Sequence, residues 1–451
     1  MTISVAELQA TVHDLFHDTA DHLAHDTGFC QRKRQLTGSV FAKTLVFALL
    51  ENPSSSLQDF ADFASAHLHV HVSHNAFEQR FTEQATAFLA ALFAAALNHC
   101  FSASAALLPL LRRFHGVFLR DASVVSLPAA LADLFPGRTG RDGKPAAALK
   151  LVVEMELCTG QFTEIEILPG LSNEKSSAIA AKPLPRGALL LEDMGFLDGG
   201  RLQEYMQQEV YFLTRVPAWT AFFEKKARGK GYQRLDVVKW LRQARGWHLE
   251  RQVYVLHKQK LALRLLAVRV PEAVAEQRKQ RVRQEAKQRG RPVGHKKLDL
   301  CEWNVLVTNA PPELISVSEG WELRRVRWQI ELVFRVFKSE GGLDKTQARS
   351  RERVLSELYA KLLAMVVLRW VLLAAGYQQL RHSGQPAARR VQQRAGALLR
   401  ALGSALELAA QIQGLAQQLK SCRIQKRHKK PSTLDRLAAL DAEYRKLEMA
   451  V

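Results

Sequence analysis

Three acidic residues stand where secondary-structure elements could bring them to one point. Asp121 interrupts the apolar run "VFLRDAS", Asp193 closes the run "LLLEDMG", and Glu331 lies in the apolar segment "WQIELVFRVF". Carboxylate oxygens are the ligands that Mg²⁺ prefers. Three of them can hold two ions about 3.5–4 Å apart, which serve the attacking and leaving oxygens of a phosphodiester. The residue types therefore predict metal-assisted phosphoryl transfer, with Glu192, next to Asp193, as a rival ligand.

The segment 323–340, LRRVRWQIELVFRVFKSE, is predicted to be one helix with an apolar face and a polar stripe. Its apolar side chains, among them Ile330, Phe334 and Phe337, favour packing on a core. The stripe consists of Arg324, Arg327, Glu331 and Lys338, which return close to one direction at about 100° per residue. Pairing of Glu331 with Arg335 would contribute only about 0.2–0.5 kcal/mol. A carboxylate on a packed helix therefore needs cations or a metal ion as its partner.

The elements that must position these acids alternate between strands and helices. The segments 116–127, 187–196 and 210–216 are predicted strands, and helices are expected near 172–181 and 200–208. This order is typical of a mixed α/β sheet with helices packed on it. The segment 217–320 is predicted to be a separate, mostly β insert.

The segment 147–170 alternates in a way that predicts a hairpin, with Thr159 and Gly160 at the turn. Four glutamates in it fall at period two: Glu154, Glu156, Glu164 and Glu166. This period predicts that all four lie on a solvated face of the sheet.

The first 110 residues are predicted to be helical. Ser56 is a plausible N-cap of one helix, and Ser73 or Asn75 of the next. Two short helices with a tight connection indicate either a helix-turn-helix, whose second helix enters the major groove, or a plain helical bundle.

The charge is strongly basic for 451 residues. Lys and Arg number 64 against 44 Asp and Glu, which gives a net charge of +20. This excess favours a polyanionic partner, with nucleic acid ahead of a membrane surface. Two apolar runs, Ala85–Leu97 and Leu358–Tyr377, are predicted to be buried helices rather than membrane spans.

Two basic runs could contact phosphates, although charge runs are usually solvated faces. The segment 275–297 carries nine Lys or Arg, and the segment 420–430 carries six with no acid.

Five cysteines stand far apart and form no CxxC or Cys/His cluster, which argues against zinc and disulfides and favours a reducing cytoplasm. The first residues show no signal-peptide pattern.

The residues Arg327, Glu331 and Lys338 match the end of a Y-(2)-R-(3)-E-(6)-K signature. The segment "RVRWQIELVFRVFKSEGGLDK" resembles the corresponding segment of DDE transposases of bacterial insertion sequences, in the type-4 branch. The segments "FLRDAS" and "LLLEDMGFLDGGRLQEYMQQEVYFLTRVP" resemble the family's two aspartate regions, in the right order. The resemblance covers about residues 110–350. One departure is Arg324, which stands where the signature has its tyrosine.

The resemblance implies an RNase H-like core with a mostly β insertion. Asp121, Asp193 and Glu331 would be the catalytic, metal-binding residues. Arg327 and Lys338 would contact phosphates of transposon-end DNA; Trp328 either lies near DNA or packs in the core, and Arg324 could bind phosphate. The expected regions are a helical DNA-binding region (1–110), the first part of the core (111–216), the insertion (217–320), the second part of the core (321–376) and a basic helical region (377–451).

The function that the resemblance implies is DNA transposition by a metal-dependent endonuclease and strand transferase. The expected cofactors are two Mg²⁺ ions, with Mn²⁺ as a substitute. The expected partners are double-stranded DNA, at transposon ends and target, and a second copy of the chain in a synaptic complex, with no membrane. The expected location is the bacterial cytoplasm, at the nucleoid when bound to DNA. An RNase H-like nuclease or resolvase that cuts without joining, and a DNA-binding protein with lapsed catalysis, are the alternatives.

Overall fold

The chain divides by its contacts into two units, each built from segments that are separated in sequence. The first unit contains residues 1–106, 121–173 and 329–432, and the second contains residues 107–120, 174–328 and 433–451. The structure, a computed structural model, describes residues 3–32, 35–101, 108–139, 146–196, 198–216, 220–256, 260–290, 292–424 and 431–448.

The second unit is built on a mixed sheet in the order β1-β4-β5-β10-β9-β8-β6-β7. Strand β1 is parallel to β4, β4 is parallel to β5, and the printed pairs from β5 onward are antiparallel. The strands are β1 (Val117–Leu127), β4 (Leu189–Glu192), β5 (Tyr211–Arg215), β6 (Phe222–Lys225), β7 (Tyr232–Leu235), β8 (His248–Val255), β9 (Leu261–Arg269) and β10 (Trp303–Thr308). All four residues of β4 are buried, as expected for a parallel strand covered on both faces.

Two helices of the second unit, α8 and α12, begin at polar caps. Ser316 and Glu319 form a capping box at the start of α12, and Asp198 accepts two backbone N–H groups at the start of α8. The helices are α7 (Pro109–Arg112), α8 (Gly199–Gln207), α9 (Val237–Gln243), α10 (Glu272–Gln288), α11 (His295–Asp299), α12 (Val317–Val326) and α18 (Thr433–Glu448).

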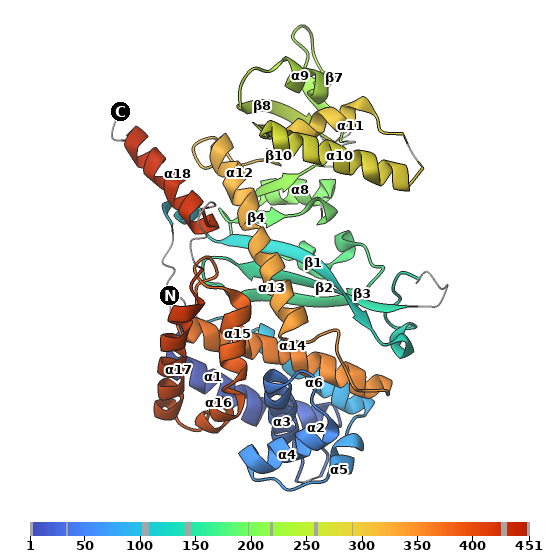
Figure 1. The fold of residues 1–451 in the computed structure, drawn as a ribbon, viewed down its shortest axis with the longest axis vertical. Helices are drawn as coiled ribbons and strands as arrows, with labels where there is room; N and C mark the ends of the chain where they lie inside the picture. Colours follow the sequence, from blue (N-terminus) through green and yellow to red (C-terminus); the bar gives the residue numbers. More distant parts are fainter. Residues whose placement is uncertain are drawn as a thin grey trace. The chain divides into compact units, whose positions relative to one another are not determined.

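The first unit joins the end of β1 to an antiparallel hairpin, in the order β1-β2-β3. Its long helix α14 packs against α3 and α6, and Figure 1 shows these helices side by side. The hairpin is β2 (Ala147–Glu156) and β3 (Phe162–Pro169). The helices are α1 (Val5–Asp14), α2 (Ala20–Asp26), α3 (Gly38–Glu51), α4 (Leu57–Leu68), α5 (His74–Glu78), α6 (Glu83–Leu97), α13 (Trp328–Ser339), α14 (Arg351–Ala374), α15 (Gly384–Gln392), α16 (Ala395–Ala401) and α17 (Ala405–Leu419).

The order β3-β2-β1-β4-β5 agrees with the RNase H-like mixed α/β sheet expected from the sequence. The predicted strands and hairpin are present, and Gly160 lies at the hairpin turn with φ +73°. The predicted buried helices are α6 and α14. None of the described helices is long and apolar enough to span a bilayer.

A buried cation joins helix α14 to the hairpin turn. The Arg369 side chain donates to the carbonyl oxygen of Gly160 at 2.5 Å and to Gln379 Oε1 at 2.9 Å. A Cβ atom at position 160 would lie 2.9 Å from Arg369 Nη2. Glycine is therefore required there twice, by its positive φ and by the approach of the guanidinium.

The predicted solvated face of the hairpin is wrong for two of its four glutamates. Glu154 and Glu156 are buried, at 3% and 9% exposure, rather than on a solvated face. Glu154 accepts a hydrogen bond from Thr163 Oγ1 at 2.9 Å, and Glu156 accepts the backbone N–H groups of Cys158 and Thr159 in the turn. These donors compensate the cost of burying the carboxylates.

The predicted helix at 172–181 is also wrong. This stretch contains two short 3₁₀ segments, Glu174–Ser176 and Ala178–Ala181. Arg201 Nη2 donates to the carbonyl oxygens of Lys175 and Ser177. Tertiary hydrogen bonds thus use acceptors that a helix would have used.

The predicted single helix at 323–340 is divided into α12 and α13 at Arg327. Arg327 keeps helical dihedral angles, φ −51° and ψ −30°, so the interruption is in the hydrogen-bond ladder. The two parts bury apolar residues in different units: Leu323 and Val326 in the second, Ile330 and Phe334 in the first. Each helix therefore packs its apolar side chains into the core of its own unit.

At the N-terminus, Ser73 rather than Asn75 is the N-cap of α5. This helix has five residues, and α4 before it begins at the predicted cap, Ser56, with a capping box. All five cysteines are free. The basic run at 420–430 lies partly outside the described residues, from 425 onward.

Candidate active site

The first predicted acid, Asp121, follows directly on a pair of buried strand residues. Arg120 of β1 is paired with Glu192 of β4 in the parallel register, and Asp121 and Asp193 are the next residues of the two chains. Asp121 is 8% exposed, and its Oδ1 accepts the backbone N–H of Ala122 at 2.9 Å. Asp121 is thus an interior residue of β1, and Asp193 is the first residue after β4.

Glu192, the rival ligand, is committed to a buried ion pair in the second unit. Its Oε2 lies 3.4 Å from Nη1 of Arg120, and the two side chains are 3% and 0% exposed. Arg120 Nη1 also donates to the Tyr205 hydroxyl at 2.9 Å, and that hydroxyl donates to the carbonyl oxygen of Ala180 at 3.3 Å. Burial raises the pKa of Tyr205, and the nearby Arg120 opposes this rise. Glu192 therefore has a buried arginine as its partner.

Asp193 has a different environment, although it is the next residue. Its side chain is 38% exposed, and its Oδ1 lies 3.1 Å from Nη2 of Arg324, whose side chain is 10% exposed. Thus the residue at the position of the signature's tyrosine contacts the second predicted aspartate, within one unit.

Further arginines of the second unit lie near Asp193. Burial lowers the pKa of Arg215, which the negative charge of Asp193 opposes, while Arg278 and Arg327 lower it further. Asp193 is therefore a carboxylate in an arginine-rich environment. The sequence prediction missed Arg215, although it ends β5, the parallel neighbour of the strand that ends before Asp193. Functional groups often lie at the carboxyl ends of adjacent parallel strands. Applied to the predicted strand 210–216, this rule would have indicated Arg215.

The remaining two residues of the second unit flank the division of the helix. Arg327 is buried at 6% exposure, and Trp328 is 53% exposed. The exposure of Trp328 argues against the core-packing alternative. A large exposed aromatic ring is available to contact a partner.

Glu331 and Lys338 lie on α13, in the first unit. Ile330, Phe334 and Phe337 of this helix are buried, and the Phe337 ring makes an edge contact with Phe162 at 5.5 Å between centroids. Glu331 lies in the first turn and Lys338 in the last. These are the ends of the helix that favour a negative and a positive charge, respectively.

The donor chemistry of the three predicted acids fits a hard divalent cation. Carboxylate oxygens suit Mg²⁺ and Mn²⁺, and the exposed part of Asp193 is open to a hydrated ion. Within the described ranges, no group of three His, Cys, Asp or Glu side chains forms a ready metal cluster. Asp121 and Glu331 belong to the first unit and Asp193 to the second, so the three-acid set stays a prediction.

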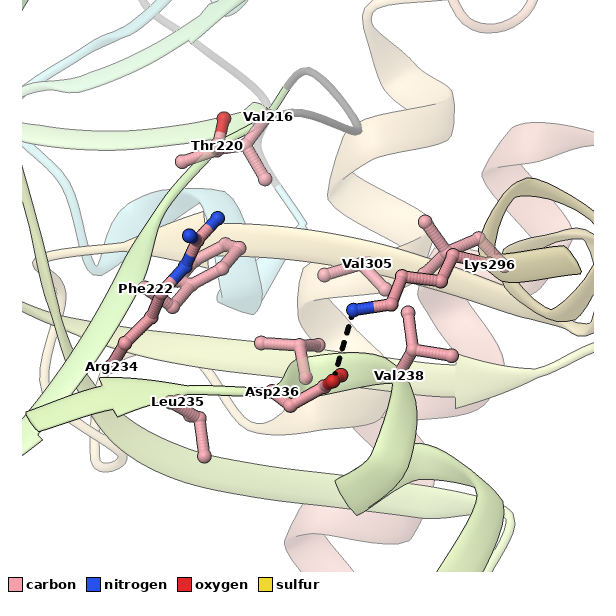
Figure 2. Close-up of a pocket in the computed structure, with 11 residues that line it drawn as sticks. Val216, Thr220, Phe222, Arg234, Leu235, Asp236, Val238, Lys296 and Val305 are labelled. Atoms are coloured by element: carbon pink, nitrogen blue, oxygen red, sulfur yellow. Dashed lines mark hydrogen bonds and ion pairs between the residues drawn. The ribbon is translucent and has the colours of Figure 1, made fainter. Parts of the chain in front are cut away.

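A pocket of the second unit lies among other residues than these. It has a volume of about 390 Å³ and is lined by parts of β6, β7, α9 and β10, including Phe222, Val238 and Val305. Figure 2 shows Asp236 and Lys296 pointing toward one another in it, with Nζ 3.0 Å from Oδ2. The predicted site residues do not line this pocket.

The sheet order β3-β2-β1-β4-β5 defines an RNase H-like α/β protein. The chain belongs to the DDE transposase family, because the family model described as "Transposase DDE domain" matches residues 112–367. Members of this family are enzymes that bind DNA and depend on a divalent metal ion.

The chain is also similar to individual transposases. It is 27% identical over 385 residues to the transposase for insertion sequence element IS231F of Bacillus thuringiensis subsp. israelensis, covering 81% of this chain and 80% of the relative. It is 24% identical over 363 residues to the transposase for IS1151 of Clostridium perfringens, covering 76% of each. Among solved structures, the piggyBac transposase synaptic complex with hairpin DNA is similar with a TM-score of 0.46 and 9% identity, covering 94% of this chain and 87% of that one.

Proposed function

We propose that this DNA transposase cuts at the ends of an insertion sequence and joins the freed 3′-hydroxyls to target DNA. The observation that carries the proposal is the register pair Arg120–Glu192 of two neighbouring parallel strands: Asp121 is the next residue of β1, and Asp193 directly follows β4. Two acids at such positions suit phosphodiester chemistry. The family match and the relatives named as insertion-sequence transposases support it.

In this proposal, Asp121, Asp193 and Glu331 are the acids that hold the metal ions. Two Mg²⁺ ions, replaceable by Mn²⁺, would supply charge stabilisation for the attacking and leaving oxygens. Arg327 and Lys338 orient DNA phosphates, the former by bidentate hydrogen bonds and the latter as a point charge. Trp328 contacts DNA through its exposed ring.

Helix α10 supplies a wider surface for the DNA backbone. Its inner side is held to the sheet: Arg278 donates to Asn304 Oδ1 at 2.9 Å, and Lys279 donates to Glu302 Oε1 at 2.9 Å. Its outer side exposes Arg283 and Lys287. A helix fixed on one side and cationic on the other suits a polyanion.

The proposal includes a homodimer that bridges two element ends, acting in the bacterial cytoplasm at the nucleoid. A dimer makes two cuts and two joins in one complex. Size measurement by light scattering, with and without paired end oligonucleotides, tests this part. One chain per pair of ends would contradict it.

The test of the function is a strand-transfer assay with cognate end oligonucleotides and Mg²⁺. Asp121→Ala, Asp193→Asn and Glu331→Gln are each expected to abolish both cleavage and joining. Glu209→Gln is the matched control, because Glu209 is an exposed acid of the same unit as Asp193, paired with Arg186. Full activity of Asp121→Ala and Glu331→Gln would show that the three-acid set is wrong.

The same assay separates the two alternatives. Cleaved DNA without joined product would identify a nuclease or resolvase. Binding without metal-dependent turnover would identify a protein with lapsed catalysis.

A further inference from the structure

We infer that Arg324 makes metal binding at Asp193 depend on bound DNA phosphate. This rests on the proposed metal site and adds a role for a residue outside the family signature. Arg324 acts through Asp193 and is a positioning residue.

The first observation is the contact itself. Arg324 Nη2 lies 3.1 Å from Asp193 Oδ1, so a guanidinium already neutralises this carboxylate without a metal ion. The Arg324 side chain is 10% exposed, whereas that of Asp193 is 38% exposed. The carboxylate of Asp193 is therefore more accessible to an ion from solvent than the guanidinium of Arg324 is.

The second observation is that Arg324 is delivered by an anchored helix. Helix α12 begins with the capping box of Ser316 and Glu319, and Glu319 Oε1 is 2.9 Å from Arg113 Nη2. Leu323 and Val326, on either side of Arg324, are fully buried. The packing of this helix therefore fixes the backbone position from which the Arg324 side chain reaches Asp193.

The third observation is the sign of the surrounding charges. Arg215 feels the negative charge of Asp193 and the positive charges of Arg278 and Arg327. A divalent cation at Asp193 would bring further positive charge into this group, and like charges at short distance repel strongly when water is partly excluded.

An arginine cannot relieve that repulsion by losing its proton, because its pKa is far above neutrality. A DNA phosphate can relieve it, since it brings negative charge to the metal ion. The metal ion and the phosphate are then favoured together and disfavoured separately. A tyrosine at position 324, as in the signature, would lack this positive charge.

The experiment measures Mn²⁺ binding by calorimetry, in the absence and presence of a short duplex that lacks element-end sequence. For the wild-type chain, the duplex is expected to tighten Mn²⁺ binding by about tenfold or more. In Arg324→Gln and Arg324→Tyr, the repulsion between the guanidinium and the ion is gone, so Mn²⁺ alone is expected to bind about tenfold tighter than in wild type, and the effect of the duplex is expected to shrink.

Arg325→Gln is the matched control. It removes the same charge from the neighbouring position, where the side chain is 41% exposed and paired with Glu322 at 3.5 Å. Its Mn²⁺ affinity is expected to stay within about twofold of wild type, because exposed charges are screened. If Mn²⁺ affinity rose equally in Arg324→Gln and Arg325→Gln, the effect would come from the loss of net positive charge and not from the position of Arg324. This result would overturn the inference.

Two further results keep the inference distinct from the proposed function. If Asp193→Asn binds Mn²⁺ as tightly as wild type, the proposed metal site itself is wrong. If Asp193→Asn loses binding but Arg324→Gln leaves the Mn²⁺ affinity unchanged, the inference alone is overturned. If the Arg324 variants fail to fold, the wild type alone still tests the inference. Reciprocity requires Mn²⁺ to tighten duplex binding by the same factor as the duplex tightens Mn²⁺ binding. If Mn²⁺ and the duplex bind independently, the role of Arg324 is refuted.

Discussion

Two successive carboxylates of this chain, Glu192 and Asp193, each bind an arginine, yet their environments differ. The sealed pair, Arg120–Glu192, has side chains 0% and 3% exposed. The open pair, Arg324–Asp193, has side chains 10% and 38% exposed. The difference teaches that one step along a strand end separates a structural ion pair from one that a ligand can reach. Two acids of the same charge therefore have opposite expected roles.

The largest expected effect is on catalysis at the open pair. Asp193→Asn is expected to lower strand transfer by about 10³-fold or more, equivalent to about 4 kcal/mol of activation free energy. The amide keeps the shape and can still accept from Arg324, so the free energy of unfolding should change little. Product formation in a gel assay, beside a denaturant titration, measures both. A fully active Asp193→Asn would remove the distinction between the two acids.

The next effect is on stability at the sealed pair. Glu192→Gln is expected to cost about 3–5 kcal/mol of unfolding free energy, because it removes one charge from a fully buried ion pair. Urea denaturation measures this cost. Arg186→Met is the control, because the Arg186–Glu209 pair is 76% and 58% exposed and is expected to contribute at most about 1 kcal/mol. Equal losses in both variants would contradict the comparison.

A buried lysine without an acid in hydrogen-bond contact extends the comparison. Lys361 is 2% exposed and donates to the carbonyl oxygens of Gly342 and Lys345, and burial lowers its pKa from 10.5 to about 8. The Lys361 ammonium group therefore loses its proton at a lower pH in the folded chain than in the unfolded chain. The free energy of unfolding of the wild type should rise between about pH 8 and pH 10.5. Relative to Lys361→Met, the rise is expected to reach roughly 3 kcal/mol.

Denaturation of both chains across this pH range measures the difference. Lys182→Met, at an exposed position, is the control and should run parallel to the wild type. A constant difference between wild type and Lys361→Met would show that the lysine is not perturbed in the folded chain.

The smallest expected effect concerns the exposed cations of α10. Replacing Arg283 and Lys287 together by glutamine should reduce the slope of log affinity against log salt by about 1.8, from about 0.9 per lost phosphate contact. Binding of duplex DNA at several salt concentrations measures the slope. Lys182→Gln with Arg186→Gln removes the same charge elsewhere on the unit and should leave the slope unchanged. Equal slopes for the α10 variant and wild type would exclude this helix from the interface.

Local patterns predicted much of the fold. The alternation of residues 147–170 predicted the hairpin, Ser56 predicted the start of α4, and the apolar run before Asp193 predicted β4. These signals lie within one element, so a single segment contains them. The strand that contains Asp121 was predicted for the same reason.

The errors came from contacts between distant segments. The burial of Glu154 is tolerated because Thr163 of the next strand donates to it, and no period within β2 indicates this. The Arg324–Asp193 contact joins residues 131 positions apart, and it depends on the register of the sheet and the packing of α12. The polar stripe predicted that Arg324 faces the same way as Glu331, but not which acid it would contact.

The turn at Gly160 has a consequence for how the sequence can change over time. Because a Cβ atom there would lie 2.9 Å from the Arg369 guanidinium, a mutation at either position alters what is tolerated at the other. Relatives that keep arginine on this helix should keep glycine in the hairpin turn. Lineages that lose the arginine are released from one of the two constraints, and the positive φ of +73° then remains as the other. The two positions, 209 residues apart, should thus be inherited as a linked pair.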